Sequence, residues 1–231
     1  MPRRTQSKPG WFVTGTDTGV GKTEIACALL RGLRSAGHDA VGFKPIVTGA
    51  EIGRDGKPHW SDAEQHWVAS DKVEPLEKIA PLRFRTPCAP VPAAKLDGQR
   101  VKFDLARAAY RELRARHEWL VVEGIGGLLV PLDHQTLVAD FIAETELPVV
   151  LVARAGLGVI SHTLLALSEL QRRKLRISKV FLNVTRPEDG ANALQSRPEI
   201  ERHARLKITI LPYRATRRDW RLRIPPFQET T

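Results

Sequence analysis

Short apolar runs alternate with amphipathic segments along the 231 residues of this chain. An apolar run of four to eight residues, bounded by turn signals, is typical of a strand buried on both faces, and such strands build parallel sheets. Strands are predicted at residues 11–14, 40–43, 119–123, 148–152, 177–182 and 207–211. The pattern therefore indicates a sheet whose strands are separated by longer polar and amphipathic connections.

Those connections carry apolar residues at helical spacing. Helices are predicted at residues 22–36, 61–70, 104–116, 136–146, 158–173 and 198–205. Ser61-Asp62-Ala63-Glu64 has the spacing of a capping box, and Asp104 is expected to cap the helix that follows it. Prolines 75, 81, 87, 90 and 92 predict that residues 71–103 are mainly loop, with room for one helical turn.

Strands alternating with helices predict an α/β fold, a mostly parallel sheet with helices on both faces. We expect one domain over residues 1–231 with a basic tail at about 214–231. Cys27 and Cys88 are too few for a disulfide framework or a zinc site. No signal-type apolar segment and no run long enough to cross a bilayer is present, so we expect a cytoplasmic protein without a membrane partner.

The net charge of +10 is concentrated partly near the C-terminus. The arginines of this region are Arg214, Arg217, Arg218, Arg221 and Arg223. Such a run is commonly a solvated face or a tail packed on acidic surface, and binding to a polyanion is the alternative. Because no aromatic-and-basic single-strand motif or zinc-finger spacing accompanies it, we do not expect nucleic acid as a partner.

A glycine-rich loop, residues 15–23, joins the first predicted strand to the first predicted helix. Gly19 and Gly21 leave room for backbone N–H groups to face a phosphate, Lys22 can reach the outer phosphates, and Thr23 offers a hydroxyl to Mg²⁺. The strict motif has glycine where this chain has Thr16. The loop predicts a P-loop NTPase-like fold that binds a nucleoside triphosphate with Mg²⁺.

Polar residues follow several of the predicted strands, at the edge where ligands bind in open α/β sheets. These residues are Gly15, Lys44, Glu123, Arg154 and Asn183. Mg²⁺ needs oxygen ligands besides Thr23, and Glu123 is a candidate because it ends a strongly apolar strand. Asp62 is a second candidate, although an acid in the first turn of a helix also stabilises that helix through the dipole.

Several blocks, in order, resemble the dethiobiotin synthetase family. They are Gly15-Thr-Asp-Thr-Gly-Val-Gly-Lys-Thr23, Gly42-Phe-Lys-Pro45 with Thr48-Gly49, Ser61-Asp62-Ala63, Val122-Glu-Gly-Ile-Gly-Gly127, and Gly156-Leu-Gly158 with His162. The resemblance covers most of residues 11–185. It implies an ATP-dependent ligase that closes the ureido ring of dethiobiotin from 7,8-diaminononanoate and CO₂, through a carbamate and a mixed anhydride with phosphate.

The resemblance also assigns roles to residues. It makes Lys22 and Lys44 catalytic, although a lysine at a strand end before Pro45 can be ordinary. It makes Thr23, Asp62 and Glu123 the Mg²⁺ ligands. The implied ATP-binding residues are Gly19, Val20, Gly21, Lys22, Thr23, Glu24, Asp62, Glu123, Gly124, Ile125, Gly126, Asn183, Val184, Pro212, Tyr213 and Arg214. Asn183 would contact adenine, whereas an Asn at a strand end is more often a turn residue.

Substrate contacts are implied at Thr18, Thr48, Gly158, Val159, Ile160 and Ser161. The last four form a helix N-terminus suited to a carboxylate, and the family supplies it from a partner subunit, which implies a homodimer. This chain departs from the family at Ser161, where asparagine is expected, and at Val91, where histidine is common. Pro212-Tyr213-Arg214 also differs from the family's Pro-Trp-Leu-like segment.

Two other functions remain alternatives. ATPases that partition DNA or deliver metals carry a second lysine five residues before the phosphate lysine, and this chain has Asp17 there. An acid cannot act as a cation toward a neighbouring subunit's phosphate, so Asp17 disfavours that class. A basic nucleic-acid-binding relative without ligase activity is the second alternative, motivated by the arginine-rich tail.

Overall fold

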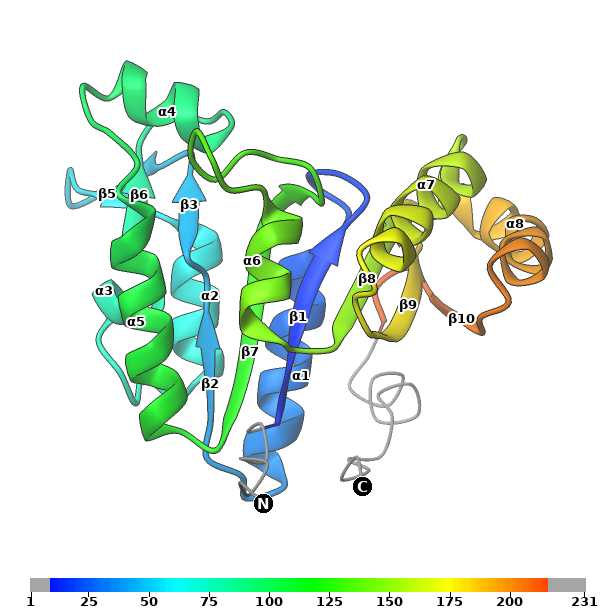
Figure 1. The fold of residues 1–231 in the computed structure, drawn as a ribbon, viewed down its shortest axis with the longest axis horizontal. Coiled ribbons are helices and arrows are strands. Elements are labelled where there is room, and N and C mark those ends of the chain that lie inside the picture. The colour runs from blue at the N-terminus through cyan, green and yellow to red at the C-terminus, as the bar shows by residue number, and fades with distance from the viewer. Residues whose placement is uncertain (1–8, 216–231) are drawn as a thin grey trace.

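The computed structural model of the chain describes residues 9–215. The main sheet of this part has six parallel strands in the order β10-β9-β8-β1-β7-β2 (Figure 1). Its strands are β1 (Gly10–Gly15), β2 (Ala40–Phe43), β7 (Trp119–Gly127), β8 (Val149–Arg154), β9 (Ile177–Asn183) and β10 (Ile208–Leu211). Because they run parallel, their carboxyl ends share one edge of the sheet.

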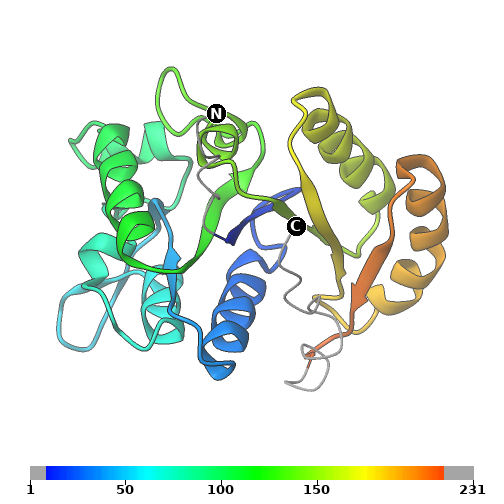
Figure 2. The same cartoon turned by 60° about the horizontal axis from the view of Figure 1, so that its bottom comes forward.

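Helices cover both faces of this sheet (Figures 1 and 2). The longer ones are α1 (Lys22–Ser35), α2 (Ser61–Ala69), α5 (Phe103–Arg116), α6 (Val138–Thr145), α7 (Val159–Arg172) and α8 (Asp189–Ala204). Successive strand residues point to opposite faces, so Phe12 packs in the core with Phe141 of α6, while Val13 packs in a second core with Leu29 of α1. The predicted α/β class, with a mostly parallel sheet covered on both sides, is confirmed.

Residues 71–103 are mainly loop, as predicted, but they hold more regular structure than the one helical turn expected. This stretch contains α3 (Leu76–Ile79), β6 (Leu82–Phe84) and α4 (Pro90–Leu96). β6 pairs in parallel with β3 (Ile46–Thr48), and the nearby β4 (Glu51–Ile52) and β5 (Pro58–His59) form an antiparallel pair. Pro75 precedes α3 and Pro90 is the first residue of α4. Proline is tolerated at helix starts because no helical N–H is lost there.

Two helix starts also differ from the prediction. α8 begins at Asp189, nine residues before the expected start at Pro198, which lies inside the helix. α5 begins at Phe103, and no side-chain hydrogen bond caps it; Asp104 instead pairs with Arg107 at 3.0 Å. Proline and aspartate are common at helix starts, and the prediction placed both boundaries wrongly because it relied on these residues alone.

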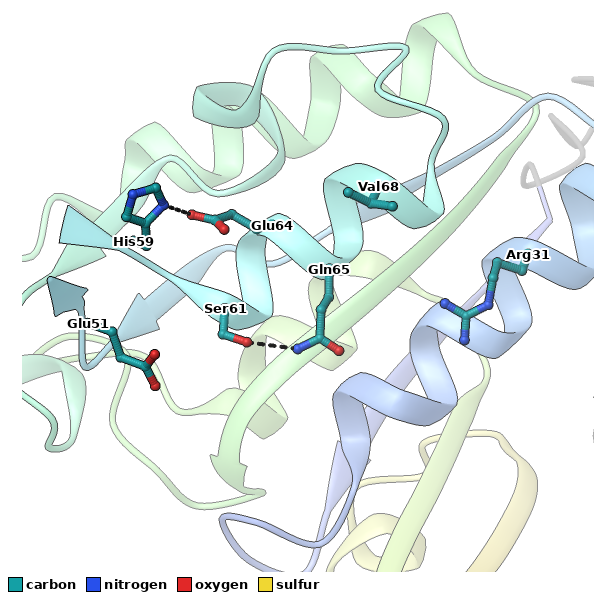
Figure 3. Close-up of a pocket in the computed structure, with 7 residues that line it drawn as sticks. All are labelled: Arg31, Glu51, His59, Ser61, Glu64, Gln65 and Val68. Carbon is teal, nitrogen blue, oxygen red and sulfur yellow. Dashed lines mark hydrogen bonds and ion pairs between the residues drawn. The ribbon is translucent and has the colours of Figure 1, made fainter. Parts of the chain in front are cut away.

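The predicted capping box at the start of α2 is not formed. Figure 3 shows Glu64 paired with His59, with Oε1 and Nδ1 2.8 Å apart, while the Ser61 hydroxyl accepts a hydrogen bond from Gln65 at 3.0 Å. Trp60 is the residue before the helix. The surface pocket in Figure 3 contains none of the predicted site residues; it is lined by Arg31, Glu51, His59, Ser61, Glu64, Gln65 and Val68. Among residues 9–215, no helix is both long and apolar enough to cross a membrane.

Candidate active site

The glycine-rich loop connects the end of β1 to the start of α1. Gly19 and Gly21 have φ angles of 71° and 96°, a region that strongly favours glycine. A Cβ atom on Gly21 would also lie 2.2 Å from the Asn183 side-chain nitrogen. That nitrogen donates a hydrogen bond to the Val20 carbonyl oxygen at 3.0 Å. Asn183 therefore supports the loop backbone from the end of β9.

Lys22 lies folded over this loop. Its Nζ atom donates to the Asp17 carbonyl oxygen at 2.7 Å, and the Asp17 carboxylate accepts the Thr18 backbone N–H at 2.7 Å. Burial lowers the pKa of Lys22 to about 8, and the nearby Lys44 charge acts in the same direction. The loop thus holds a partly desolvated ammonium group, and a bound anion would offset the free-energy cost of this desolvation.

Lys44, just after β2, links the predicted metal ligands. Its ammonium group contacts Glu123 Oε1, lies 3.2 Å from Asp62 Oδ2 and donates to the Gly124 carbonyl oxygen at 3.1 Å. The Thr23 hydroxyl donates to Glu123 Oε1 at 2.9 Å. Lys44 and Glu123 are buried, whereas Asp62 is partly exposed. Residues from four separate elements of the sequence therefore meet in one cluster.

Both members of the Lys44–Glu123 pair are held in their charged forms. Burial alone would raise the pKa of Glu123, but the Lys44 charge and a hydrogen bond from His66 outweigh it and hold this pKa at about 2. Burial alone would lower the pKa of Lys44, but the carboxylates of Glu123 and Asp62 keep it above its ordinary value. The cluster is therefore a buried ion pair with a second carboxylate at its exposed side.

His66, which the sequence analysis missed, contacts this cluster from α2. Its side chain is fully buried, and its Nε2 atom lies 2.7 Å from Glu123 Oε2. An ionised carboxylate only accepts hydrogen bonds, so Nε2 is the donor. The available signal was spacing, since His66 follows Asp62 by four residues and such residues share one helix face.

The cluster has the donor chemistry of a magnesium site. Two carboxylates already converge on a cation, the Lys44 ammonium, and the Thr23 hydroxyl donates to one of them. Within the described residues, no group of three or more His, Cys, Asp or Glu side chains could hold a metal ion unaided. Mg²⁺ fits Thr23, Asp62 and Glu123 nonetheless, because it commonly binds one or two carboxylates and takes its other ligands from water and phosphate oxygens.

The remaining predicted nucleotide contacts flank this edge of the sheet. Gly124, Ile125 and Gly126 lie in the last part of β7, and Glu24 lies in the first turn of α1. The Val184 N–H donates to the Leu211 carbonyl oxygen at 3.0 Å, which joins the ends of β9 and β10. Pro212, Tyr213 and Arg214 follow β10, with the Arg214 guanidinium 5.2 Å from the Tyr213 ring centroid. The other arginines of the basic tail lie outside the described residues.

The predicted substrate contacts are divided between two places. Thr18 lies in the loop near Gly126, and Thr48 is the last residue of β3. The segment 158–161 opens α7, where Gly158 has a φ of 87°. Within residues 9–215, no hydrogen bond or ion pair joins this segment to the Lys44 cluster, and Figure 1 shows α7 and α2 on opposite sides of β1. The assignment of these residues as substrate contacts stays a prediction.

A parallel α/β sheet, a glycine-rich loop that leads into a buried lysine at the start of α1, and a buried β7 carboxylate that accepts a hydrogen bond from Thr23 together define a P-loop NTPase-like protein. In agreement, a family model described as an AAA domain matches residues 10–215. The MinC:MinD cell division protein complex of Aquifex aeolicus shares the fold, with a TM-score of 0.55 at 13% identity over 92% of this chain and 84% of that chain.

Curated relatives narrow this class further. The ATP-dependent dethiobiotin synthetase BioD of Anaeromyxobacter dehalogenans is 50% identical over 88% of this chain and 90% of its own length. The BioD protein of Bacillus licheniformis is 38% identical over 84% of this chain and 80% of its own length. The chain belongs to the ATP-dependent dethiobiotin synthetase family. This confirms the resemblance found in its sequence.

Proposed function

We propose that this protein is a cytoplasmic, single-domain ATP- and Mg²⁺-dependent ligase that forms dethiobiotin from 7,8-diaminononanoate and CO₂. One amine captures CO₂ as a carbamate, ATP phosphorylates the carbamate, and the second amine attacks the resulting mixed anhydride and expels phosphate. Family membership and the convergence of Lys22, Lys44 and Glu123 on one edge of the sheet support this proposal.

The reaction transfers a phosphoryl group and then closes a ring, so it depends mainly on placing cations around developing negative charge. Lys22 is assigned to the transferred phosphoryl group because its ammonium is already desolvated inside the phosphate loop. Lys44 is assigned to the carbamate, and Thr18 and Thr48 to the reacting end of the diamine. Bound Mg²⁺ would neutralise phosphate charge, held by Thr23, Asp62 and Glu123.

A homodimer is part of this proposal. The Gly158–Ser161 segment would bind the substrate carboxylate at a helix N-terminus and would do so in the neighbouring subunit's site. One feature supports it: Leu157, directly before Gly158 at the start of α7, is a large apolar side chain that is fully exposed. Ser161 supplies a hydroxyl at a position where the family has a carboxamide.

ATP hydrolysis and dethiobiotin formation, measured with the diamine and bicarbonate present or omitted, test the proposal. We expect hydrolysis to require both compounds and dethiobiotin to form. Lys44→Ala should abolish product while leaving much of the nucleotide binding. Hydrolysis indifferent to the diamine, with no dethiobiotin, would contradict the ligase activity, whereas loss of both product and binding in Lys44→Ala would make Lys44 a phosphate contact only.

A switch ATPase is the rival function, and Asp17 argues against it. The Asp17 carboxylate is bonded to the backbone of its own loop, where a switch ATPase would need a cation. The likeness to the MinC:MinD complex, at 13% identity, concerns the fold alone.

A further inference from the structure

His66 gives the two oxygens of Glu123 different surroundings. Oε1 receives the Thr23 hydroxyl at 2.9 Å and the Lys44 ammonium, so it faces the groups around the cation position. Oε2 receives the His66 Nε2–H at 2.7 Å, in a place where both side chains are fully buried. Only one oxygen of this carboxylate is therefore directed toward the phosphate loop and Lys44.

The His66 ring is held by a polar stripe along α2. Asp62, His66 and Ser70 lie four residues apart, so they share one face of the helix. The Ser70 hydroxyl donates to the His66 carbonyl oxygen at 2.7 Å and accepts the Gly42 N–H of β2 at 2.9 Å. This stripe fastens α2 to the same strand that leads into Lys44.

Gly42 makes room for the ring. A Cβ atom at residue 42 would lie 2.5 Å from His66 Nδ1, closer than side-chain atoms pack. Among the described residues Nδ1 has no hydrogen-bond partner, so Glu123 receives the ring's one polar contact. Burying a histidine with an unsatisfied Nδ1 atom lowers stability. This loss is explained if the contact with Glu123 has a function.

We propose that His66 is a positioning residue that reserves Oε2 of Glu123 and so limits this carboxylate to one oxygen toward the metal ion. The inference rests on the proposed Mg²⁺ set. Mg²⁺ keeps a small octahedral shell, whereas Ca²⁺ accepts more ligands and often takes both oxygens of a carboxylate. His66 therefore favours Mg²⁺ over Ca²⁺ in the nucleotide complex.

The affinity for a fluorescent ATP analogue, titrated in Mg²⁺, in Ca²⁺ and in EDTA, tests this role without measuring turnover. His66→Leu removes the donor, and we expect the Mg²⁺-to-Ca²⁺ affinity ratio to fall about tenfold, a typical effect of removing a partner of a metal ligand. His66→Gln is the matched control, because its amide nitrogen can occupy the place of Nε2. It should keep the ratio within about twofold of the wild type.

Equal ratios in the wild type, His66→Leu and His66→Gln would overturn the proposal. If His66→Leu does not fold, Gly42→Ala displaces the same ring without removing it, and we expect the same fall; an unchanged ratio there would also overturn the proposal. Wild-type affinity that is equal in Mg²⁺ and in EDTA and unaffected by Glu123→Gln would contradict the Mg²⁺ set itself. Affinity that depends on Mg²⁺ and Glu123 but not on residue 66 would contradict the role of His66 alone.

Discussion

Replacing Lys44 and Glu123, separately and together, measures how strongly the buried pair stabilises the metal-free protein. The pKa of Glu123 is about 2 in the folded protein against an ordinary 4.5. A difference of about two and a half pKa units corresponds to about 3 kcal/mol at pH 7. Lys44→Met and Glu123→Gln should therefore each lower the free energy of unfolding by about 3–5 kcal/mol, since each leaves a buried charge without its main partner.

The pH dependence of this effect has a definite sign. The folded pKa of Glu123 is depressed, so its stabilisation is complete above pH 4.5 and is lost as the pH falls toward 2. The stability difference between the wild type and Glu123→Gln should accordingly shrink to less than half by about pH 3. A difference that grows on acidification would contradict the ion pair as its cause.

Urea unfolding at pH 7, with EDTA and without nucleotide, is the assay. The double variant Lys44→Met/Glu123→Gln removes both charges together, so its loss should be smaller than the sum of the single losses by at least about 2 kcal/mol. Losses that add within about 0.5 kcal/mol would refute the coupling that the contacts predict.

Three further predictions concern the loop and α8. Lys22→Met should raise the free energy of unfolding at pH 7 by about 1–3 kcal/mol, because the lowered pKa of Lys22 makes its charged form costly in the folded protein. This cost is complete below pH 8 and disappears as the pH rises from 8 to 10.5. The variant should also lose ATP-analogue binding, and a lower free energy of unfolding would contradict this prediction. Asn183→Ala should weaken ATP-analogue binding about fivefold to tenfold through loss of the Val20 contact, and unchanged fluorescence titrations would contradict it. Pro198→Ala should raise the free energy of unfolding by about 1–3 kcal/mol, because a proline inside a helix removes a backbone hydrogen bond; equal or lower stability in urea would count against this.

The strands of the main sheet were predictable because their apolar runs and the turn residues around them indicate the same elements. The runs at β1, β2, β7, β8 and β9 are apolar on both faces, and turn residues bound them. The short elements between residues 46 and 96 were not, because their strands have only two or three residues and depend on partners far along the chain. β3 forms only where β6 lies beside it, 36 residues later.

The site was predictable where a motif fixes a residue's place, and not where packing does. Lys22, Thr23 and Glu123 follow from the loop motif and the apolar run before Glu123, and the structure brings them together, although β7 continues past Glu123 to Gly127. His66 contacts Glu123 only because α2 packs against β2, and that depends on Ser70 and Gly42. In the sequence, Asp62 had an equally good role as a helix-start acid; the structure places it beside Lys44, and its role as a metal ligand stays a prediction.

As a member of the dethiobiotin synthetase family, this protein is expected to build the ureido ring of dethiobiotin. Incubation with ATP, Mg²⁺, the diamine and ¹³C-labelled bicarbonate, followed by mass spectrometry, tests it most directly. We predict dethiobiotin carrying one ¹³C atom, formed in equal amount with ADP and phosphate. ATP consumed without labelled dethiobiotin, by protein that binds nucleotide normally, would contradict the account.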